Sequence, residues 1–313
     1  MADPWEDTIV IALRDIQWMG QRGANRLAPR LPVFIKFDGP TEQTLGDLAY
    51  QQGERFYLFE VKSSHRAISS EWNKIVKQKP RRKLAFETLS ALARKAVASP
   101  SSDDIWAALW TSLRCHHFVY WSDQLFNADD TLGNILVEPY ISGCIRKGAT
   151  RIDKASAMPA LSYCTAMKEQ NGELSLAARL PFSAIRDQRG LVTTTDKLDA
   201  KNIVPLGEDL PRFKAYLRFL VDSGGIGDGQ INAVISSDRG RFTKIVTSID
   251  QLGLELEPRP GSKPVAKMTR KSVPCPPELD AALAALSETK TERPNFPALF
   301  GPKPAPRLRR LQP

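Results

Sequence analysis

The feature that most constrains the fold is the segment RFYLFEVKSS at positions 55–64, where strand-forming residues surround an acid and a base. Because side chains alternate across a β-strand, Glu60 and Lys62 lie on the same face. Phe56 and Leu58 share that face, which argues against a strand with one exposed polar side. Isolated charges are strongly disfavoured in the protein interior, so something must offset their burial. A metal ion would do so; the alternative is a surface strand with an exposed salt bridge.

Asp47 lies in the preceding β-prone segment TLGDLAY, residues 44–50, which residues 51–54 connect to this strand. A hairpin of the two segments would bring the carboxylates of Asp47 and Glu60 together. Two converging carboxylates repel one another unless a cation lies between them. Hard oxygen ligands of this kind suit Mg²⁺, with Mn²⁺ as a possible substitute.

Asp47 followed by Glu60-Val61-Lys62 resembles the motif of the PD-(D/E)xK nuclease superfamily, over roughly the first 140 residues. The resemblance implies a restriction-endonuclease-like α/β fold, with a four-stranded mixed sheet flanked by helices. It also implies Mg²⁺-dependent hydrolysis of DNA phosphodiesters. Asp47, Glu60 and Val61 would contact the metal, and Lys62 would act as catalytic base or stabilise charge. Gly46 stands where the name of the motif has proline.

The first helix is expected at residues 4–19, with Asp3 as N-cap and Pro4 at its first position. Members of the superfamily often add an acid from this helix to the site, which makes Glu6 a fourth candidate catalytic residue. Glu6 is also three residues after Asp3, the spacing of an ordinary capping box. Both interpretations stand at this point.

The chain has 44 Lys and Arg against 35 Asp and Glu, a net charge of +9, and such a charge favours polyanionic partners. Between Trp72 and Lys95 the only acid is Glu87. This helical and basic segment, with a break expected at Pro80, predicts contacts to DNA phosphates, although a solvated helix face is the alternative. The expected nucleic-acid-binding residues are Lys74, Lys77, Gln78, Lys79, Arg81, Arg82 and Lys83.

Three regions are expected along the chain. Residues 1–147 form the nuclease-like domain, with further strands at 116–121 and 134–141 and a Trp-rich helix at 103–113. Residues 148–257 form an α+β accessory region that binds DNA or a partner, with a helix at 210–222 and a strand at 231–237. Residues 258–313 hold 12 of the 23 prolines and form a basic, largely flexible tail with a short helix near 277–287.

Several other features indicate what is not encoded. The sequence Cys115-His116-His117 lacks a second ligand pair at zinc-finger spacing. The glycines of residues 224–229 lack the context of a nucleotide-binding loop, so no nucleotide cofactor is expected. Trp106, Trp110 and Trp121 are expected in the core rather than stacked on bases. The sequence has no secretory signal and no long apolar stretch, which predicts a cytoplasmic protein that does not associate with a membrane.

The sequence therefore predicts a Mg²⁺-dependent deoxyribonuclease that acts with a protein partner or as a homodimer. A nuclease without an ATPase is typical of multi-component restriction, defence, transposition or repair systems. Two alternatives stay open: a catalytically inactive DNA-binding or scaffold subunit of the same fold, and an RNA-directed nuclease, since RNA preference leaves no motif here.

Overall fold

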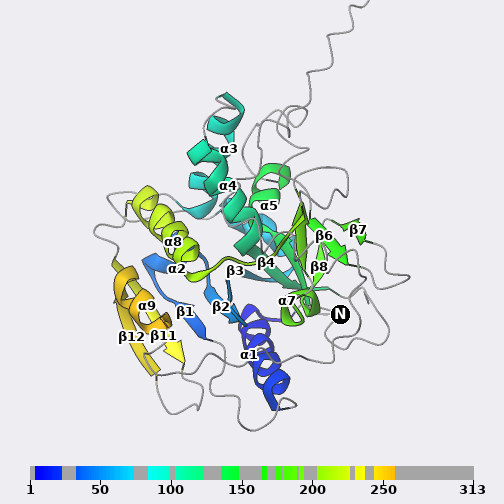
Figure 1. The fold of residues 1–313 in the computed structure, drawn as a ribbon, viewed down its shortest axis with the longest axis vertical. Helices are drawn as coiled ribbons and strands as arrows, with labels where there is room; N and C mark the ends of the chain where they lie inside the picture. Colours follow the sequence, from blue (N-terminus) through cyan, green and yellow to red (C-terminus); the bar gives the residue numbers. More distant parts are fainter. Residues whose placement is uncertain are drawn as a thin grey trace, which may run out of the picture.

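The computed structural model describes residues 4–22, 33–73, 84–98, 103–122, 135–147, 164–167, 174–177, 179–188, 190–193, 203–225, 230–236 and 243–257. Its centre is a mixed eight-stranded sheet covered by helices, which confirms the α/β class (Figure 1). The strand order is β12-β11-β1-β2-β3-β4-β5-β8.

Five central strands come from the first half of the chain: β1 (Phe34–Phe37), β2 (Leu48–Gln52), β3 (Arg55–Ser64), β4 (His116–Trp121) and β5 (Ile135–Pro139). β1, β2 and β3 are antiparallel neighbours, β4 is parallel to β3, and β5 is antiparallel to β4. A parallel pair needs a long crossover, which α3 (Ala85–Ala98) and α4 (Asp103–Cys115) provide between β3 and β4.

The second half of the chain completes both sides of the same sheet. β11 (Gln230–Ser236) pairs with β1 and with β12 (Thr243–Ser248), while β8 (Leu180–Pro181) pairs with β5. The sequence patterns predict a domain boundary between residues 147 and 148. The large sheet and one hydrophobic core both include residues from before and after this position. Residues 258–313, expected as a tail with a short helix, lie outside the described residues.

A separate four-stranded sheet also comes from the second half. Its order is β10 (Ile203–Pro205), β9 (Leu191–Thr193), β6 (Cys164–Met167) and β7 (Leu174–Ala177), all antiparallel.

Helices cover the two faces of the large sheet unequally. α1 (Glu6–Arg22) covers the face that contains Phe34, whose ring lies 5.5 Å from the Arg14 guanidinium carbon. α7 (Ser183–Arg186) follows Phe182 on that same face, where Phe182 packs on Tyr50. The register places Tyr50 opposite Phe34, so both helices lie on one side.

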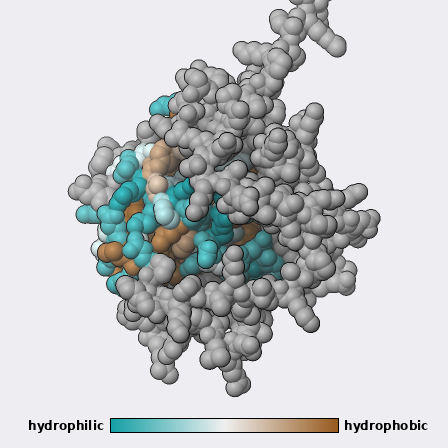
Figure 2. Space-filling view, in the orientation of Figure 1, coloured by the Kyte–Doolittle hydropathy of each residue, from teal (hydrophilic) through white to brown (hydrophobic). Residues whose placement is uncertain are grey.

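The opposite face is covered by most of the other helices. α8 (Leu210–Gly224) places Phe213 on Phe56, with ring centroids 5.5 Å apart, and α5 (Tyr140–Lys147) places Tyr140 on Phe118 at 4.5 Å. The remaining elements are α2 (Pro40–Leu45), the 3₁₀ helix η1 (Arg66–Asn73) and α9 (Ile249–Leu256). In Figure 2 the coloured surface, over the side where α8 and α9 lie, mixes hydrophilic and hydrophobic residues.

Sequence patterns located most of the central elements. The strands expected at 55–64 and 116–121 have these bounds in the structure. The expected strand at 44–50 begins only at Leu48, because Pro40 occupies the first turn of α2, which continues to Leu45. Trp110 and Trp121 pack partly buried against the core as expected; the side chain of Trp106 lies outside the described residues. No helix in the described part of the chain is long and apolar enough to span a membrane.

Candidate active site

Asp47 lies at the end of the hairpin where β2 begins. Its backbone N–H donates to the carbonyl of Phe59 at 2.9 Å, and its Oδ2 accepts a hydrogen bond from the Val61 N–H at 2.5 Å. Since Leu48 pairs with Phe59, Asp47 is level with Glu60 and on the same face of the sheet. The hairpin thus brings together the two carboxylates that sequence reasoning had paired.

Gly46 is required by the backbone at this turn. Its φ of +119° is a conformation that L side chains rarely adopt, and a Cβ there would lie 3.1 Å from the Phe59 carbonyl oxygen. Proline is excluded because its ring fixes φ near −65°. The glycine at this position, in place of a proline, therefore has a local cause. The same Cβ would lie 3.6 Å from Glu60 Oε2, so this oxygen is directed towards the start of β2.

Lys62 lies between two buried carboxylates. Its Nζ is 2.5 Å from Glu60 Oε1 and 3.3 Å from Glu71 Oε2. Tyr140 on α5 donates its hydroxyl to Glu71 Oε1 at 2.8 Å. Glu60, Lys62 and Glu71 are only 1%, 3% and 1% exposed, respectively. The alternative of a surface strand with an exposed salt bridge is therefore wrong, and Lys62 is buried between the two carboxylates.

Sequence reasoning missed Glu71. It lies on η1, which folds back from the end of β3 over the face that holds Lys62. One signal was present: Glu71 is the only acid between Lys62 and Glu87. Trp72 beside it packs partly buried against the core. A single acid in a basic and partly apolar segment indicates that its carboxylate pairs with a buried group rather than lying in solvent.

The electrostatics of Asp47 differ from those of an exposed acid. Burial raises its pKa well above the usual value, and the neighbouring Glu60 carboxylate raises it further, while Lys36 and Lys62 act in the opposite direction. Ionised Asp47 is therefore under strain from desolvation and from like charge, and a nearby cation would relieve both.

Lys36 and Glu42 lie beside Asp47, where the site reaches the surface. The Lys36 Nζ is 3.9 Å from both Asp47 Oδ1 and Glu42 Oε1, and the Lys36 and Glu42 side chains are 40% and 37% exposed. The Asp47 side chain is 11% exposed, whereas Glu60 and Lys62 lie deeper. Substrate would therefore reach this cluster from the Asp47 side.

The donor set fits a hard divalent cation. In the described part of the chain, no three or more His, Cys, Asp or Glu side chains are grouped so as to hold a metal. Mg²⁺ does not require such a group, because it usually takes one or two carboxylates and keeps several waters or substrate phosphates. Asp47 and Glu60 supply the carboxylates. Val61 has an apolar side chain, so its contribution would be limited to its main-chain carbonyl.

The structure does not bring Glu6 to this cluster. Glu6 is exposed at the first position of α1, and α1 packs against the opposite face of the sheet. The capping-box alternative involves Asp3, which lies outside the described residues. The expected nucleic-acid-binding residues also lie outside them: Lys74, Lys77, Gln78, Lys79, Arg81, Arg82 and Lys83. Arg94 and Lys95, which end the basic segment, are exposed on α3.

The pair His116-His117 is divided between the two faces of β4. His116 stacks on Tyr140 and its Nδ1 is 3.0 Å from the Tyr216 hydroxyl. His117 Nε2 is 3.0 Å from the carbonyl oxygen of Arg114 on the other side, and burial lowers the pKa of His117 to about 4. His117 is therefore neutral at physiological pH.

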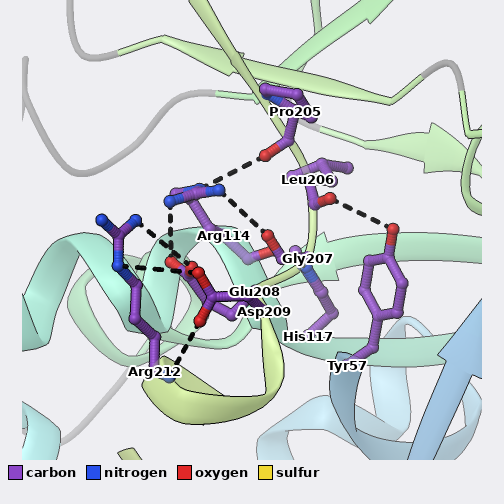
Figure 3. Close-up of polar contacts among 9 residues, drawn as sticks. All are labelled: Tyr57, Arg114, His117, Pro205, Leu206, Gly207, Glu208, Asp209 and Arg212. Carbon is purple, nitrogen blue, oxygen red and sulfur yellow. Dashed lines mark hydrogen bonds and ion pairs between the residues drawn. The ribbon is translucent and has the colours of Figure 1, made fainter. Parts of the chain in front are cut away.

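A second buried ion pair joins the segment before α8 to the end of α4 (Figure 3). Arg114 Nη1 lies 2.9 Å from Glu208 Oε1, and Arg114 donates to the carbonyls of Pro205 and Gly207 at 3.2 and 3.1 Å. The backbone of Glu208 forms a two-way bridge with Phe56 on β3. Burial raises the pKa of Glu208, and Arg114 opposes the rise.

This second cluster is a structural support rather than a second site. Arg114 is fully engaged by the carboxylate and by two carbonyls, and Tyr57 donates its hydroxyl to the carbonyl of Leu206 at 3.2 Å from the other side (Figure 3). These contacts fix the start of α8 against β3, on the face that holds Glu60.

The fold and the site together define an α/β protein with a buried carboxylate–lysine cluster on one face of a mixed sheet. Comparison of the chain with protein-family models, with curated proteins and with solved structures gave no match. The functional argument therefore depends on the geometry of the residues themselves.

Proposed function

We propose that this protein is a metal-dependent deoxyribonuclease whose site consists of Asp47, Glu60 and Lys62. The observation that supports it most is the convergence of Asp47 with Glu60 beside Lys62 on one buried face. A sheet face gains nothing from two adjacent acids unless a cation joins them. The PD-(D/E)xK resemblance attaches the nuclease chemistry to this arrangement. Its coarse α/β class, a mixed sheet flanked by helices, supports the proposal, although the sheet has eight strands rather than four.

Each residue has a separate task in this proposal. Asp47 and Glu60 would hold Mg²⁺, which when bound activates water and stabilises charge on the phosphate under attack. Lys62 orients the attacking water or stabilises the developing negative charge. Glu71 holds the Lys62 ammonium in place, and Tyr140 fixes Glu71. The sheet and η1 keep bulk water from Lys62, which strengthens each of these interactions.

Cleavage of linear and circular DNA tests the proposal, with Mg²⁺, Mn²⁺ or EDTA. Asp47→Asn is the sharpest variant, because the amide keeps the size of the side chain and an oxygen that can accept the Val61 N–H. Asp250→Asn, at an exposed position of α9, is the matched control. We expect metal-dependent cutting that is lost in Asp47→Asn and kept in Asp250→Asn. Cutting that persists in Asp47→Asn would refute the assignment.

One observation favours a second candidate function, a DNA-binding or scaffold subunit without activity. Lys62 is enclosed by Glu60 and Glu71, and a buried ion cluster can serve the fold alone. Metal binding separates the two candidates. In a nuclease, Mg²⁺ or Mn²⁺ stabilises the protein and Asp47→Asn removes this stabilisation, whereas a scaffold is not stabilised by either metal. An association with partner proteins, as in restriction or defence systems, is part of the proposal, and vigorous cutting by the isolated chain would argue against it.

A further inference from the structure

A polar cluster beside the proposed metal site has no task in the mechanism above. Its centre is Glu138 on β5, which is completely buried. Three side chains from different elements approach the same oxygen, Glu138 Oε2: the Tyr120 hydroxyl at 3.4 Å, His65 Nε2 at 3.4 Å and Arg179 Nε at 3.8 Å. Tyr120 is buried, but the side chains of His65 and Arg179 are 30% and 37% exposed. One partly exposed guanidinium and one partly exposed imidazole are thus held by one interior carboxylate.

The strand register places this cluster on the same sheet face as the metal site. Glu60 pairs with Phe118, and Phe118 pairs with Glu138 on the next strand. Lys62 pairs with Tyr120, whose ring lies 5.4 Å from that of His65. On β8, Leu180 pairs with Val137 of β5. Arg179 directly precedes Leu180, so the antiparallel register places it next to Glu138, on the side away from β4.

The carboxyl of Glu138, which holds His65 and Arg179, lies too far from the position of Glu60 to act on the scissile bond itself. Neighbouring strands are about 4.8 Å apart, so the β3 and β5 residues of this row are roughly 10 Å apart. A general acid must come within about 3 Å of the proton it transfers. A nucleic-acid strand has one phosphate per nucleotide, so an offset of this size suits a neighbouring phosphate rather than the scissile one.

The charges of the cluster suit an anion. Glu138 contributes −1, Arg179 contributes +1, and His65 contributes +1 when protonated, which gives a net +1 for the protonated cluster and zero for the neutral imidazole. In the described part of the chain, the titratable groups that contact His65 include Glu138 on β5 and Tyr120 on β4. We propose that His65 and Arg179 form a subsite for a backbone phosphate of the bound nucleic acid, beside the scissile phosphate. This inference rests on the proposed function.

The experiment measures binding of a fluorescent DNA oligonucleotide in EDTA, so that no cutting occurs, over a series of salt concentrations. Loss of one phosphate contact lowers the slope of log Kobs against log salt by about 1. We expect this loss for Arg179→Gln and for His65→Gln. Lys244→Gln is the matched control, since Lys244 is also a partly exposed cation paired with one carboxylate, Glu255.

If Arg179→Gln and His65→Gln have the same slope as the wild type, the phosphate subsite is refuted. This holds even if the wild-type protein shows metal-dependent cleavage and the nuclease proposal is supported. If both variants have reduced slopes but the wild-type protein cuts no DNA, the nuclease proposal is refuted and the phosphate subsite is retained. A third arm replaces chloride with inorganic phosphate at equal ionic strength. Specific displacement of DNA by phosphate from the wild type, but not from Arg179→Gln, would mean that the free anion is the ligand and would refute the nucleic-acid assignment.

Discussion

Asp47 Oδ2 accepts a hydrogen bond from the Val61 N–H, which ties the residue before β2 to the strand that holds Glu60 and Lys62. This bond fixes one carboxylate oxygen of Asp47 at the edge of the buried sheet face, next to Glu60. It also explains how the buried Asp47 stays next to Glu60. Backbone pairing sets the position of Asp47, and the unfavourable contribution is the electrostatic one, from desolvation and from like charge. A bound cation would remove that remaining cost.

The first prediction concerns metal binding without substrate. Mg²⁺ or Mn²⁺ should raise the melting temperature of the wild-type protein, because a ligand at about 100 times its Kd adds about 2.7 kcal/mol to stability. For a chain of this size that corresponds to several degrees, at roughly 2–4 °C per kcal/mol. Thermal unfolding of Asp47→Asn should show no such rise, whereas Asp250→Asn should behave as the wild type. Equal metal responses in all three proteins would exclude Asp47 as a ligand.

The second prediction concerns pH in the absence of metal. The folded-state pKa of Asp47 lies above the ordinary value of 3.8, so the stability from its protonated form is fully present below that value. This stability is lost as pH rises through the raised pKa. Asp47→Asn should therefore unfold at higher denaturant concentration than the wild type at neutral pH, and the advantage should shrink on acidification. Urea titrations with EDTA across this range check it; an advantage independent of pH would contradict the electrostatic cause.

The third prediction concerns Lys62. Lys62→Met keeps the bulk of the side chain but leaves Glu60 and Glu71 buried without their cation, which should cost about 3–5 kcal/mol of stability. The matched change Lys244→Met breaks a pair that is partly exposed, so its cost should stay below about 1 kcal/mol. Urea unfolding at neutral pH measures both. Similar small losses would show that the buried cluster is not coupled as described.

The fourth prediction concerns Gly46. Gly46→Ala must adopt φ of +119° and bring its Cβ to 3.1 Å from the Phe59 carbonyl, which should cost about 1–3 kcal/mol and displace Asp47. Gly39→Ala shares the positive φ but meets no atom within 4 Å, so it isolates the backbone cost. Both should lose stability, but only Gly46→Ala should also lose the metal-induced rise in melting temperature. An intact metal response in Gly46→Ala would separate this turn from the site.

The fifth prediction concerns the second buried ion pair. Arg114→Met removes the partner of Glu208 and also the donor to two carbonyls, so it should destabilise the protein more than Glu208→Gln, which keeps Arg114 and its carbonyl contacts. A loss of about 3–5 kcal/mol is expected for Arg114→Met. Unfolding of both single variants and of the double variant gives their coupling. Additive losses would show that the two side chains act independently.

Local patterns were enough to predict which residues of β3 share a face and that a hairpin connects it to Asp47. Alternation in RFYLFEVKSS depends only on the pleat of a strand, and the tight connection at Gly53 depends only on turn chemistry. These are short-range properties, so a single sequence encodes them. The α/β class followed in the same way from the order of helical and strand-like segments.

Interactions distant in sequence could not be read from these patterns. Glu71 reaches Lys62 because η1 folds back over β3, and Tyr140 reaches Glu71 across 69 positions of the chain. Glu6 had the right residue type in the first helix, yet α1 packs on the other face of the sheet. Which face a helix covers depends on its apolar stripe and on the partners available to bury it, and a local motif contains neither.

The sequence by itself determined the acid, the base and their shared face on β3, because side-chain alternation needs no partner. Long-range packing decided that Glu71 and Tyr140 enclose Lys62 on this face, that β11 and β12 extend the same sheet, and that Arg114 binds the segment before α8. Burial and long-range pairing depend on how all elements pack around one core. That packing converts a pair of charges on a strand into a desolvated cluster with a perturbed Asp47.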